Sequence, residues 1–273
     1  MVASPIGNLA DLTLRAIHLL GRVDVVACED TRVSAQLLNH LGIDKPLLTL
    51  HAHNEALAAE AVLGRLARGE TVALLSDAGT PAISDPGALL VARVAAAGHR
   101  VVPVPGASSA AAAVSVAGDG VGQGFVFRGF LPAKGAERRD AFADCIASGS
   151  QQVLFEAPHR IEALAEALAA AAPQRRLTLC RELTKQFETI ATMPAAELPA
   201  WLAADPNRRR GEFVLVLHAQ PAAAAPGLAP EALRTLDLLL GELPLKQAVA
   251  LAAAITGAPR NTLYEQALAR RTG

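Results

Sequence analysis

The sequence is poor in cysteine and in aromatic residues. Its 273 residues include three cysteines, which lie far apart along the chain and are odd in number. This usage is typical of a protein kept in a reducing compartment, and it excludes a CxxC metal site. Aromatic residues make up 3% of the chain, which argues against a broad aromatic surface on which nucleic-acid bases could stack.

The sequence also lacks a long apolar run that could cross a membrane. No stretch without a charge is longer than residues 101–118, and Pro103, Pro105 and Gly106 interrupt that stretch. The chain opens on Met1-Val2-Ala3 with neither a basic nor an apolar leader, so we expect a cytoplasmic protein that is not exported. The apolar fraction of 52% excludes a disordered chain.

Several catalytic signatures are missing as well. The sequence has no GxxxxGK[ST] loop for a nucleoside triphosphate and no GxSxG elbow of a serine hydrolase. His51 and His53 lie two positions apart without a third ligand nearby, so we expect no metal. Residues 118–124 have GxGxG spacing, but a predicted helix precedes them and a strand follows, which is the reverse of a phosphate-binding loop. We interpret this glycine run as a flexible hinge and a domain boundary.

Short β-branched runs alternate with Ala- and Leu-rich stretches of helical length in the first part of the chain. We expect strands at residues 1–4, 23–28, 47–50, 71–75 and 100–104, and helices at 12–21, 33–41, 55–68, 86–97 and 107–117. Strands separated by helices of this length form a mostly parallel sheet. Asp85 and Pro86 are expected to start the helix at 86–97, as its N-cap and first residue.

After the glycine run only some links are long enough for helices, which predicts a mixed sheet. We expect strands at residues 125–130, 152–155, 177–180, 187–192 and 212–218, and helices at 136–147, 158–171 and 195–203. Residues 221–227 are interpreted as a linker to three short helices at 230–240, 245–256 and 260–270. The sequence therefore predicts an α/β protein with two α/β domains, 1–120 and 125–220, and a helical extension over 228–273.

Polar loops rich in Gly and Pro follow four of the expected strands, at residues 4–9, 28–32, 76–87 and 103–109. Because loops that follow parallel strands gather at one edge of a sheet, we expect these four to form one ligand site. Their acidic and hydroxyl side chains, with few cations, suit a neutral or cationic ligand better than a phosphate. A sulfonium compound meets this description.

These loops resemble the signature loops of the tetrapyrrole-methylase-like, class III S-adenosylmethionine methyltransferases. The resemblance extends to Gly129-Phe130-Leu131-Pro132, Phe155-Glu156-Ala157-Pro158-His159-Arg160, Arg181-Glu182-Leu183-Thr184-Lys185, Gly211-Glu212 and, in the tail, Asn261-Thr262-Leu263-Tyr264. The whole set is similar to the branch that 2′-O-methylates a cytidine in the 16S ribosomal RNA of the small subunit. It implies an S-adenosylmethionine cleft between two α/β domains, and a homodimer.

Carried over position by position, the resemblance implies a set of residues that bind the cofactor. They are Pro5, Asp77, Ala78, Gly79, Ile83, Ser108, Ser109, Phe155 and Glu156. A carboxylate in this set would lie near the cationic methionyl group, and a ring or apolar edge would contact the adenine. Phe155 could equally be a residue of the core, and Asp77 could shape its turn.

A ribose hydroxyl is a poor nucleophile, so its proton has to be removed or its oxyanion stabilised during attack. The candidate catalytic residues are Glu29, Asp30, Arg32, Glu182 and Lys185. The sequence singles out none of them as the base, since each could instead form a structural ion pair.

The substrate RNA would be held by basic residues that contact phosphates without reading sequence. Residues 128–220 hold 12 Lys and Arg against 11 Asp and Glu, so a polyanion would bind to a local patch only. The candidates are Arg128, Lys134, Arg138, Arg139 and Arg160, with Arg208–Arg210 and the helical tail as further possibilities. A tetrapyrrole C-methyltransferase and a non-catalytic ribosome-assembly factor stay open as alternatives.

Overall fold

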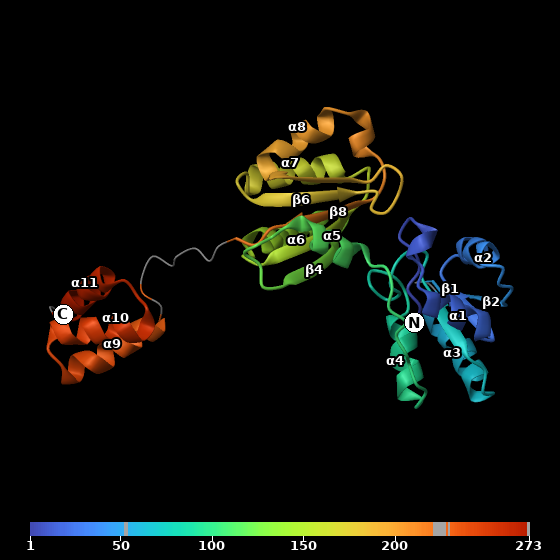
Figure 1. The fold of residues 1–273 in the computed structure, drawn as a ribbon, viewed down its shortest axis with the longest axis horizontal. Coiled ribbons are helices and arrows are strands. Elements are labelled where there is room, and N and C mark those ends of the chain that lie inside the picture. The colour runs from blue at the N-terminus through green and yellow to red at the C-terminus, as the bar shows by residue number, and fades with distance from the viewer. Residues whose placement is uncertain (52–53, 221–227, 229, 272–273) are drawn as a thin grey trace. The chain divides into compact units, whose positions relative to one another are not determined.

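The computed structural model describes residues 1–51, 54–220, 228 and 230–271. The chain divides into two compact units, residues 1–220 and 221–273 (Figure 1). Within its described residues, the first unit contains two separate β-sheets, one before and one after the glycine run. The predicted linker at 221–227 lies outside the described residues. The domain bounds 1–120, 125–220 and 228–273 stay a prediction. None of the described helices has both the length and the apolar character needed to cross a membrane.

The first sheet is parallel and has the strand order β2-β1-β3, with β2 at Leu47–Thr49, β1 at Val25–Cys28 and β3 at Val72–Leu75. Helices α1 (Leu14–Arg22) and α2 (Thr31–His40) pack on one face, and α3 (Glu55–Ala67) and α4 (Ala88–Ala96) pack on the other. Successive residues of β1 point to alternate faces, so all four are buried. The predicted parallel α/β arrangement is confirmed.

Two expected strands of this sheet are wrong. Residues 1–4 and 100–104 form only isolated bridges, at Val2, Ser4 and Val104. Pro103 and Pro105 flank Val104 and have no N–H groups, so they cannot extend a hydrogen-bonded ladder on either side of it.

The start of α4 also differs from the expectation. The helix begins at Ala88 after Gly87, two residues beyond the predicted start at Pro86. A carboxylate from the neighbouring helix α3 caps it, because Glu55 Oε1 accepts hydrogen bonds from the N–H groups of Gly87, Leu89 and Leu90 at 3.0, 2.8 and 3.2 Å. A negative charge at a helix N-terminus is favourable, and it makes a local N-cap side chain unnecessary.

The second sheet is mixed, as predicted, with the order β4-β5-β8-β6-β7. Only β4 and β5 are parallel. The strands are β4 (Phe125–Phe130), β5 (Gln151–Glu156), β6 (Arg176–Arg181), β7 (Thr189–Pro194) and β8 (Phe213–Leu217). Helices α6 (Gly135–Ala147), α7 (Ile161–Ala171) and α8 (Leu198–Ala203) pack through one large apolar cluster on one side of the sheet. The cluster under the other side includes residues of α5 (Ser109–Ala117).

Helix α5 precedes the glycine run but packs against β6 and β8 of the second sheet. The glycine run that follows it is tied down by the Asp119 carboxylate, which accepts hydrogen bonds from Val121 N, Gly122 N, Gln151 Nε2 and Ala219 N. These bonds argue against the expectation of a flexible hinge at residues 118–124.

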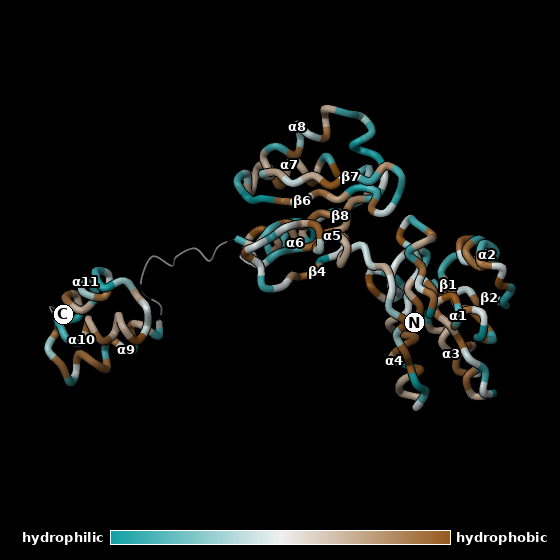
Figure 2. The backbone as a smooth tube through the Cα atoms, viewed as in Figure 1, coloured by the Kyte–Doolittle hydropathy of each residue, from teal (hydrophilic) through white to brown (hydrophobic). Residues whose placement is uncertain are grey.

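The described residues of the second unit form three helices, α9 (Pro230–Glu242), α10 (Leu245–Thr256) and α11 (Arg260–Arg271). Their expected positions are confirmed, with ends shifted by no more than two residues. The mostly apolar α10 stands out in Figure 2 and contacts both of its neighbours. Leu236, Val249 and Leu263, one from each helix, are fully or almost fully buried in the shared core.

Candidate active site

The four polar loops predicted to form one site are joined by hydrogen bonds. The bonds are Ser4 N to Gly79 O (2.8 Å), Asp30 N to Asp77 Oδ1 (3.1 Å) and Thr80 Oγ1 to Ala107 O (3.1 Å). Each bond joins the loop at 76–87 to one of the other three. This loop is therefore the centre of the site, and the prediction that the four loops gather is confirmed.

The loop at 76–87 has an unusual backbone. Ala82 and Ser84 have φ angles of 68° and 65°, in the left-handed region that residues with a Cβ rarely adopt. Strand β4 of the second sheet comes close to it through Gly129, where a bulge interrupts the pairing with β5. A Cβ at Gly129 would lie 2.8 Å from Ser84 Oγ, and φ there is +62°, so only glycine fits without a shift.

A cavity of about 340 Å³ lies where this loop meets the second sheet. Seven of the nine predicted cofactor residues line it, namely Ala78, Gly79, Ile83, Ser108, Ser109, Phe155 and Glu156. Pro5 and Asp77 do not line the cavity; Asp77 accepts the hydrogen bond from Asp30 N. Ser108 also caps α5, since its side chain accepts from Ala111 N at 3.5 Å.

Nine further residues that were not predicted from the sequence also line the cavity. They are Thr80, Ser84, Asp85, Phe130, Ala157, Pro158, Glu212, Phe213 and Val214. Most of them belong to the motifs quoted above, so membership of a motif was a usable signal. Phe130 and Phe127 both pack edge-on against Phe155, with ring centroids 5.5 and 5.1 Å from it, so the Phe155 ring is held in place by aromatic neighbours.

Glu156 forms part of the cavity wall, and its side chain is 0% exposed. Arg160 Nε lies 2.9 Å and Arg138 Nη2 lies 3.4 Å from its carboxylate oxygens, and Ala157 N donates to it at 3.0 Å. Arg160 also donates to the Leu131 carbonyl at 2.8 Å. A buried carboxylate requires such partners. The structure therefore directs two of the five predicted RNA-binding cations toward a buried residue of the protein.

The other three predicted RNA-binding residues are exposed. Arg128 donates to Gln152 Oε1 at 2.7 Å. Lys134 and Arg139 lie at the start of α6 and take part in no ion pair within the described part of the chain. These two side chains are the ones most available to an external anion.

Four carboxylates lie close together after β1 and β3. Burial, and then the nearby charges of Asp77, Asp85 and Asp30, raise the pKa of Glu29. Burial also raises the pKa of Asp85. In contrast, the hydrogen bond from the Arg32 side chain lowers the pKa of Asp30 to about 2. Asp30 also caps α2, because it accepts from Arg32 N at 2.8 Å.

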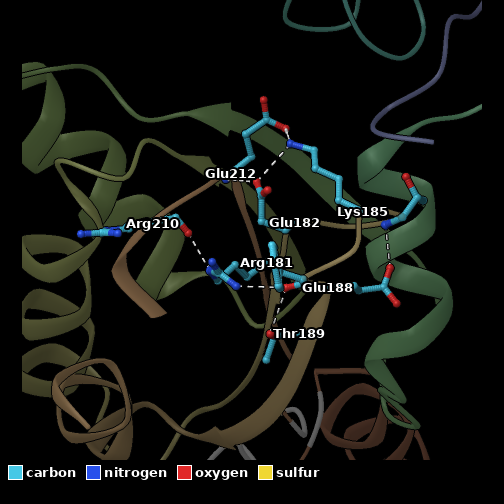
Figure 3. A network of polar contacts seen from close by, with 9 residues as sticks. Arg181, Glu182, Lys185, Glu188, Thr189, Arg210 and Glu212 are labelled. Atoms are coloured by element: carbon cyan, nitrogen blue, oxygen red, sulfur yellow. Dashed lines mark hydrogen bonds and ion pairs between the residues drawn. The ribbon is translucent and has the colours of Figure 1, made fainter. Parts of the chain in front are cut away.

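Figure 3 shows the remaining candidates, Glu182 and Lys185, in one polar network. Lys185 Nζ lies 3.0 Å from both Glu182 Oε1 and Glu212 Oε2. Burial alone would lower the pKa of Lys185, but its bonds to Glu212 and Glu182 outweigh burial and raise it. Gly7 lies directly against this lysine, since a Cβ there would overlap with Lys185 Cγ.

The same contacts act on Glu182. Burial would raise the pKa of Glu182, but the N–H of Glu212 and the Lys185 ammonium donate hydrogen bonds to it, and the net effect lowers its pKa. Glu212 lines the cavity, so the network reaches the candidate site through this one residue.

Among the described residues, no group of three or more His, Cys, Asp or Glu side chains could hold a metal ion. His53, one of the two histidines considered for a metal, lies outside the described residues.

Two families match the chain. Residues 1–199 match the family described as "Tetrapyrrole (Corrin/Porphyrin) Methylases", and residues 226–271 match the "RsmI C-terminal HTH domain". The chain is 50% identical to "Ribosomal RNA small subunit methyltransferase I" of Pseudomonas aeruginosa, over 99% of this chain and 96% of that protein. It is 48% identical to the protein of the same name from Escherichia coli O157:H7, over 98% of this chain and 93% of that protein.

Solved structures share the fold at low sequence identity. Uroporphyrin-III-C-methyltransferase from Thermus thermophilus superposes with a TM-score of 0.55 at 20% identity, over 80% of this chain and 92% of that one. Diphthine synthase superposes with a TM-score of 0.61 at 14% identity, over 80% of this chain and 88% of that one. The predicted fold class is therefore confirmed.

Proposed function

The chain belongs to the tetrapyrrole methylase family, in its branch of ribosomal RNA small subunit methyltransferases I, and from this we propose that it methylates a cytidine of 16S ribosomal RNA on the ribose 2′-oxygen with S-adenosylmethionine as donor. The observation that carries the proposal is the cavity of about 340 Å³ and the chemistry of its lining. Its volume lies in the range of small-molecule sites.

The lining suits a sulfonium donor. Among the described residues that line the cavity, Asp85 and Glu212 are acidic, the carboxylate of Glu156 is buried and paired with two arginines, and none is Lys or Arg. The arginines and the lysine that pair with Glu156 and Glu212 are not part of the lining, so the surface offered to a ligand is acidic or neutral. When bound, S-adenosylmethionine supplies a methyl group activated by its positively charged sulfur.

The remaining lining residues suit the other parts of the donor. The fixed ring of Phe155 and the side chain of Ile83 give an apolar wall for the adenine, and the hydroxyls of Ser108 and Ser109 offer hydrogen bonds. Main-chain groups of Ala78 and Gly79 would bind the methionine and ribose portions. Holding a donor and a ribose in line contributes much of the rate in such a transfer.

Glu29 is the candidate best suited to accept the proton of the 2′-hydroxyl. Its raised pKa makes the carboxylate more basic than that of an ordinary glutamate. It interacts electrostatically with Asp85, which lines the cavity. Glu182 has a lowered pKa and is already bonded to Lys185, so it is a weaker base.

Lys185 suits a different role. Glu212 and Glu182 stabilise its ammonium form, so the group carries a positive charge at neutral pH and has no free electron pair to accept a proton. We assign this charge to the stabilisation of negative charge on the reacting ribose oxygen. Arg32 is bound to Asp30 and is assigned to the start of α2.

The RNA would be positioned through phosphate contacts on the second sheet and α6. Lys134, Arg139 and Arg128 are the exposed members of the predicted set. Arg138 and Arg160 would act indirectly, by holding Glu156 in the cavity wall. We further propose that the chain works as a homodimer in the cytoplasm, where its three buried free cysteines would stay reduced. Light scattering should give twice the mass of 28.2 kDa, and a monomer would overturn the dimer.

The test of the function combines donor binding with the position of the methyl group. The full chain is incubated with S-adenosylmethionine labelled in its methyl group and small subunits from a strain without this activity, and the labelled RNA is hydrolysed in alkali. Label at an alkali-resistant linkage next to a cytidine is expected, because a methylated 2′-oxygen cannot attack the neighbouring phosphate.

Other outcomes would overturn the proposal. Label on a base would refute ribose methylation, and label on a uroporphyrin-type tetrapyrrole in a parallel reaction would favour the C-methyltransferase alternative. Calorimetric binding of the donor without any transfer to RNA would favour a non-catalytic assembly factor.

A further inference from the structure

The helical unit carries a groove between α10 and α11. Its lining residues are Lys246, Val249, Arg260, Asn261, Tyr264 and Glu265, and its volume is about 550 Å³. Lys246 lies in the first turn of α10, and Arg260 and Asn261 are the first two residues of α11. Arg260, Tyr264 and Leu268 are spaced by four residues, so they follow one another along one face of α11.

The groove brings together three kinds of group that bind nucleic acid. Lys246 and Arg260 are exposed, and neither forms an ion pair within residues 230–271. Tyr264 is the single tyrosine of a chain with few aromatic residues, and it is 38% exposed. Asn261 offers both a donor and an acceptor. The positive end of α11 lies at the same place and adds to the attraction for an anion.

In the first unit, two of the cations predicted to bind RNA are paired with a buried carboxylate. Of the five cations predicted to hold the RNA there, Arg138 and Arg160 pair with Glu156. The other members of the set are few for a substrate as large as ribosomal RNA. A second, separate set of contacts on the helical unit would supply the missing affinity, since two linked binding surfaces reinforce each other.

We propose that this groove binds a single-stranded segment of the substrate RNA. Lys246 and Arg260 contact its phosphates, Tyr264 stacks on one unpaired base, and Asn261 forms a hydrogen bond with the edge of that base or with its ribose. A single ring can stack on a base only where the base is free of its neighbours, which favours a loop or a bulge over a duplex. This inference rests on the proposed function, because it takes RNA to be the substrate.

The experiment measures binding of the full chain to protein-free 16S ribosomal RNA and to small subunits, at several salt concentrations. The groove variants are Lys246→Glu, Arg260→Glu, Tyr264→Ala and Tyr264→Phe. The matched control is Arg234→Glu, which makes the same charge change at an exposed position of α9 outside the groove. Calorimetry with S-adenosylmethionine and a thermal melt accompany each variant.

The expected result follows from the roles of the side chains. Each charge reversal in the groove weakens binding to protein-free RNA about 10-fold at 0.15 M salt and lowers the slope of log K against log salt by about 0.7 or more. Tyr264→Ala weakens binding about 5- to 150-fold, whereas Tyr264→Phe keeps the stacking ring and binds like the wild type. Donor affinity and melting temperature stay unchanged throughout.

Two results would overturn the inference. In the first, Lys246→Glu and Arg260→Glu bind protein-free RNA as well as Arg234→Glu does. In the second, the groove variants lose affinity for assembled subunits only, which would mean that the groove contacts a ribosomal protein. A wild-type chain that transfers no methyl group to RNA would refute the proposed function instead, and the binding measurements would still decide on the groove.

Discussion

The pairing of Arg160 with Glu156 leads to a prediction that separates a structural role from an RNA-binding role. The variant Arg160→Met keeps most of the side-chain volume but removes the cation that lies 2.9 Å from a fully buried carboxylate. Breaking a buried ion pair from one side costs about 3–5 kcal/mol, because the remaining charge loses its partner. Glu156 would keep Arg138 at 3.4 Å and the N–H of Ala157, so we expect a loss of stability at or just below the lower end of this range, about 2–3 kcal/mol.

Urea unfolding and a thermal melt measure this loss. At about 2–4 °C per kcal/mol for a domain of this size, the melting temperature should fall by about 4–12 °C. The matched control is Arg139→Met, one position beyond Arg138 on α6, where the side chain is exposed and the change should stay within about 0.5 kcal/mol. The double variant Arg160→Met with Glu156→Gln should lose less stability than the two single variants together, because the amide carries no charge to leave unpaired.

The reasoning would be refuted if Arg160→Met and Arg139→Met unfolded at the same urea concentration. It would also be refuted if Arg160→Met lost RNA affinity as Arg139→Met does while its stability and donor affinity stayed those of the wild type. That second result would restore the interpretation of Arg160 as a phosphate ligand.

Three further predictions concern the loops around the cavity. The raised pKa of Glu29 means that its carboxylate forms only at a higher pH than usual, so the rising limb of the pH–rate profile should lie above the ordinary glutamate range. Glu29→Gln should abolish that limb and slow methyl transfer about 10²–10⁴-fold. An unchanged profile in this variant would exclude Glu29 as the base. The pKa of Asp30 is depressed from 3.8 to about 2, so its contribution to stability is present above pH 3.8 and disappears as the pH falls toward 2. In this pH window the stability of Asp30→Asn should therefore depend less on pH than that of the wild type. An equal pH dependence of stability in the two proteins would contradict the ion pair. Gly129→Ala should destabilise the chain by about 1–3 kcal/mol and weaken donor binding in calorimetry, since the added Cβ would meet Ser84 Oγ at 2.8 Å. Gly124→Ala serves as its control, because a Cβ there meets no atom within 4 Å. Equal stability of the two variants would show that the loop at 76–87 adjusts to the added Cβ without loss of stability.

The order of helices and strands could be predicted because their signals are local. The runs that became β1 and β3 are short and apolar, and Gly and Pro mark the loops that follow them. The expected strand at 100–104 failed although its residues are β-branched, since its two prolines cannot donate hydrogen bonds. The capping of α4 by Glu55 was beyond the reach of sequence reasoning, because it joins residues more than 30 positions apart.

The candidate site was predictable in its outline but not in its partners. Motif resemblance identified seven of the residues that line the cavity, including Phe155 and Glu156. It also assigned Arg138 and Arg160 to RNA, because a cluster of basic residues in a sequence gives no sign of a buried carboxylate that it faces. The opposite pKa shifts of Glu29 and Glu182 depend on burial and on neighbours distant in sequence, so the sequence alone could not separate a base from an ion-pair partner.

The attachment of α5 to the second sheet decides which residues of the cavity depend on which sheet. Ser108 and Ser109 lie at the start of that helix and are attached to the second sheet, whereas Ala78 and Ile83 follow β3 of the first sheet. The segment 103–107 links these two groups of lining residues, and the hydrogen bond from Thr80 to Ala107 joins it to the loop at 76–87. The shape of the cavity therefore depends on how the two sheets are held together, and on neither sheet alone.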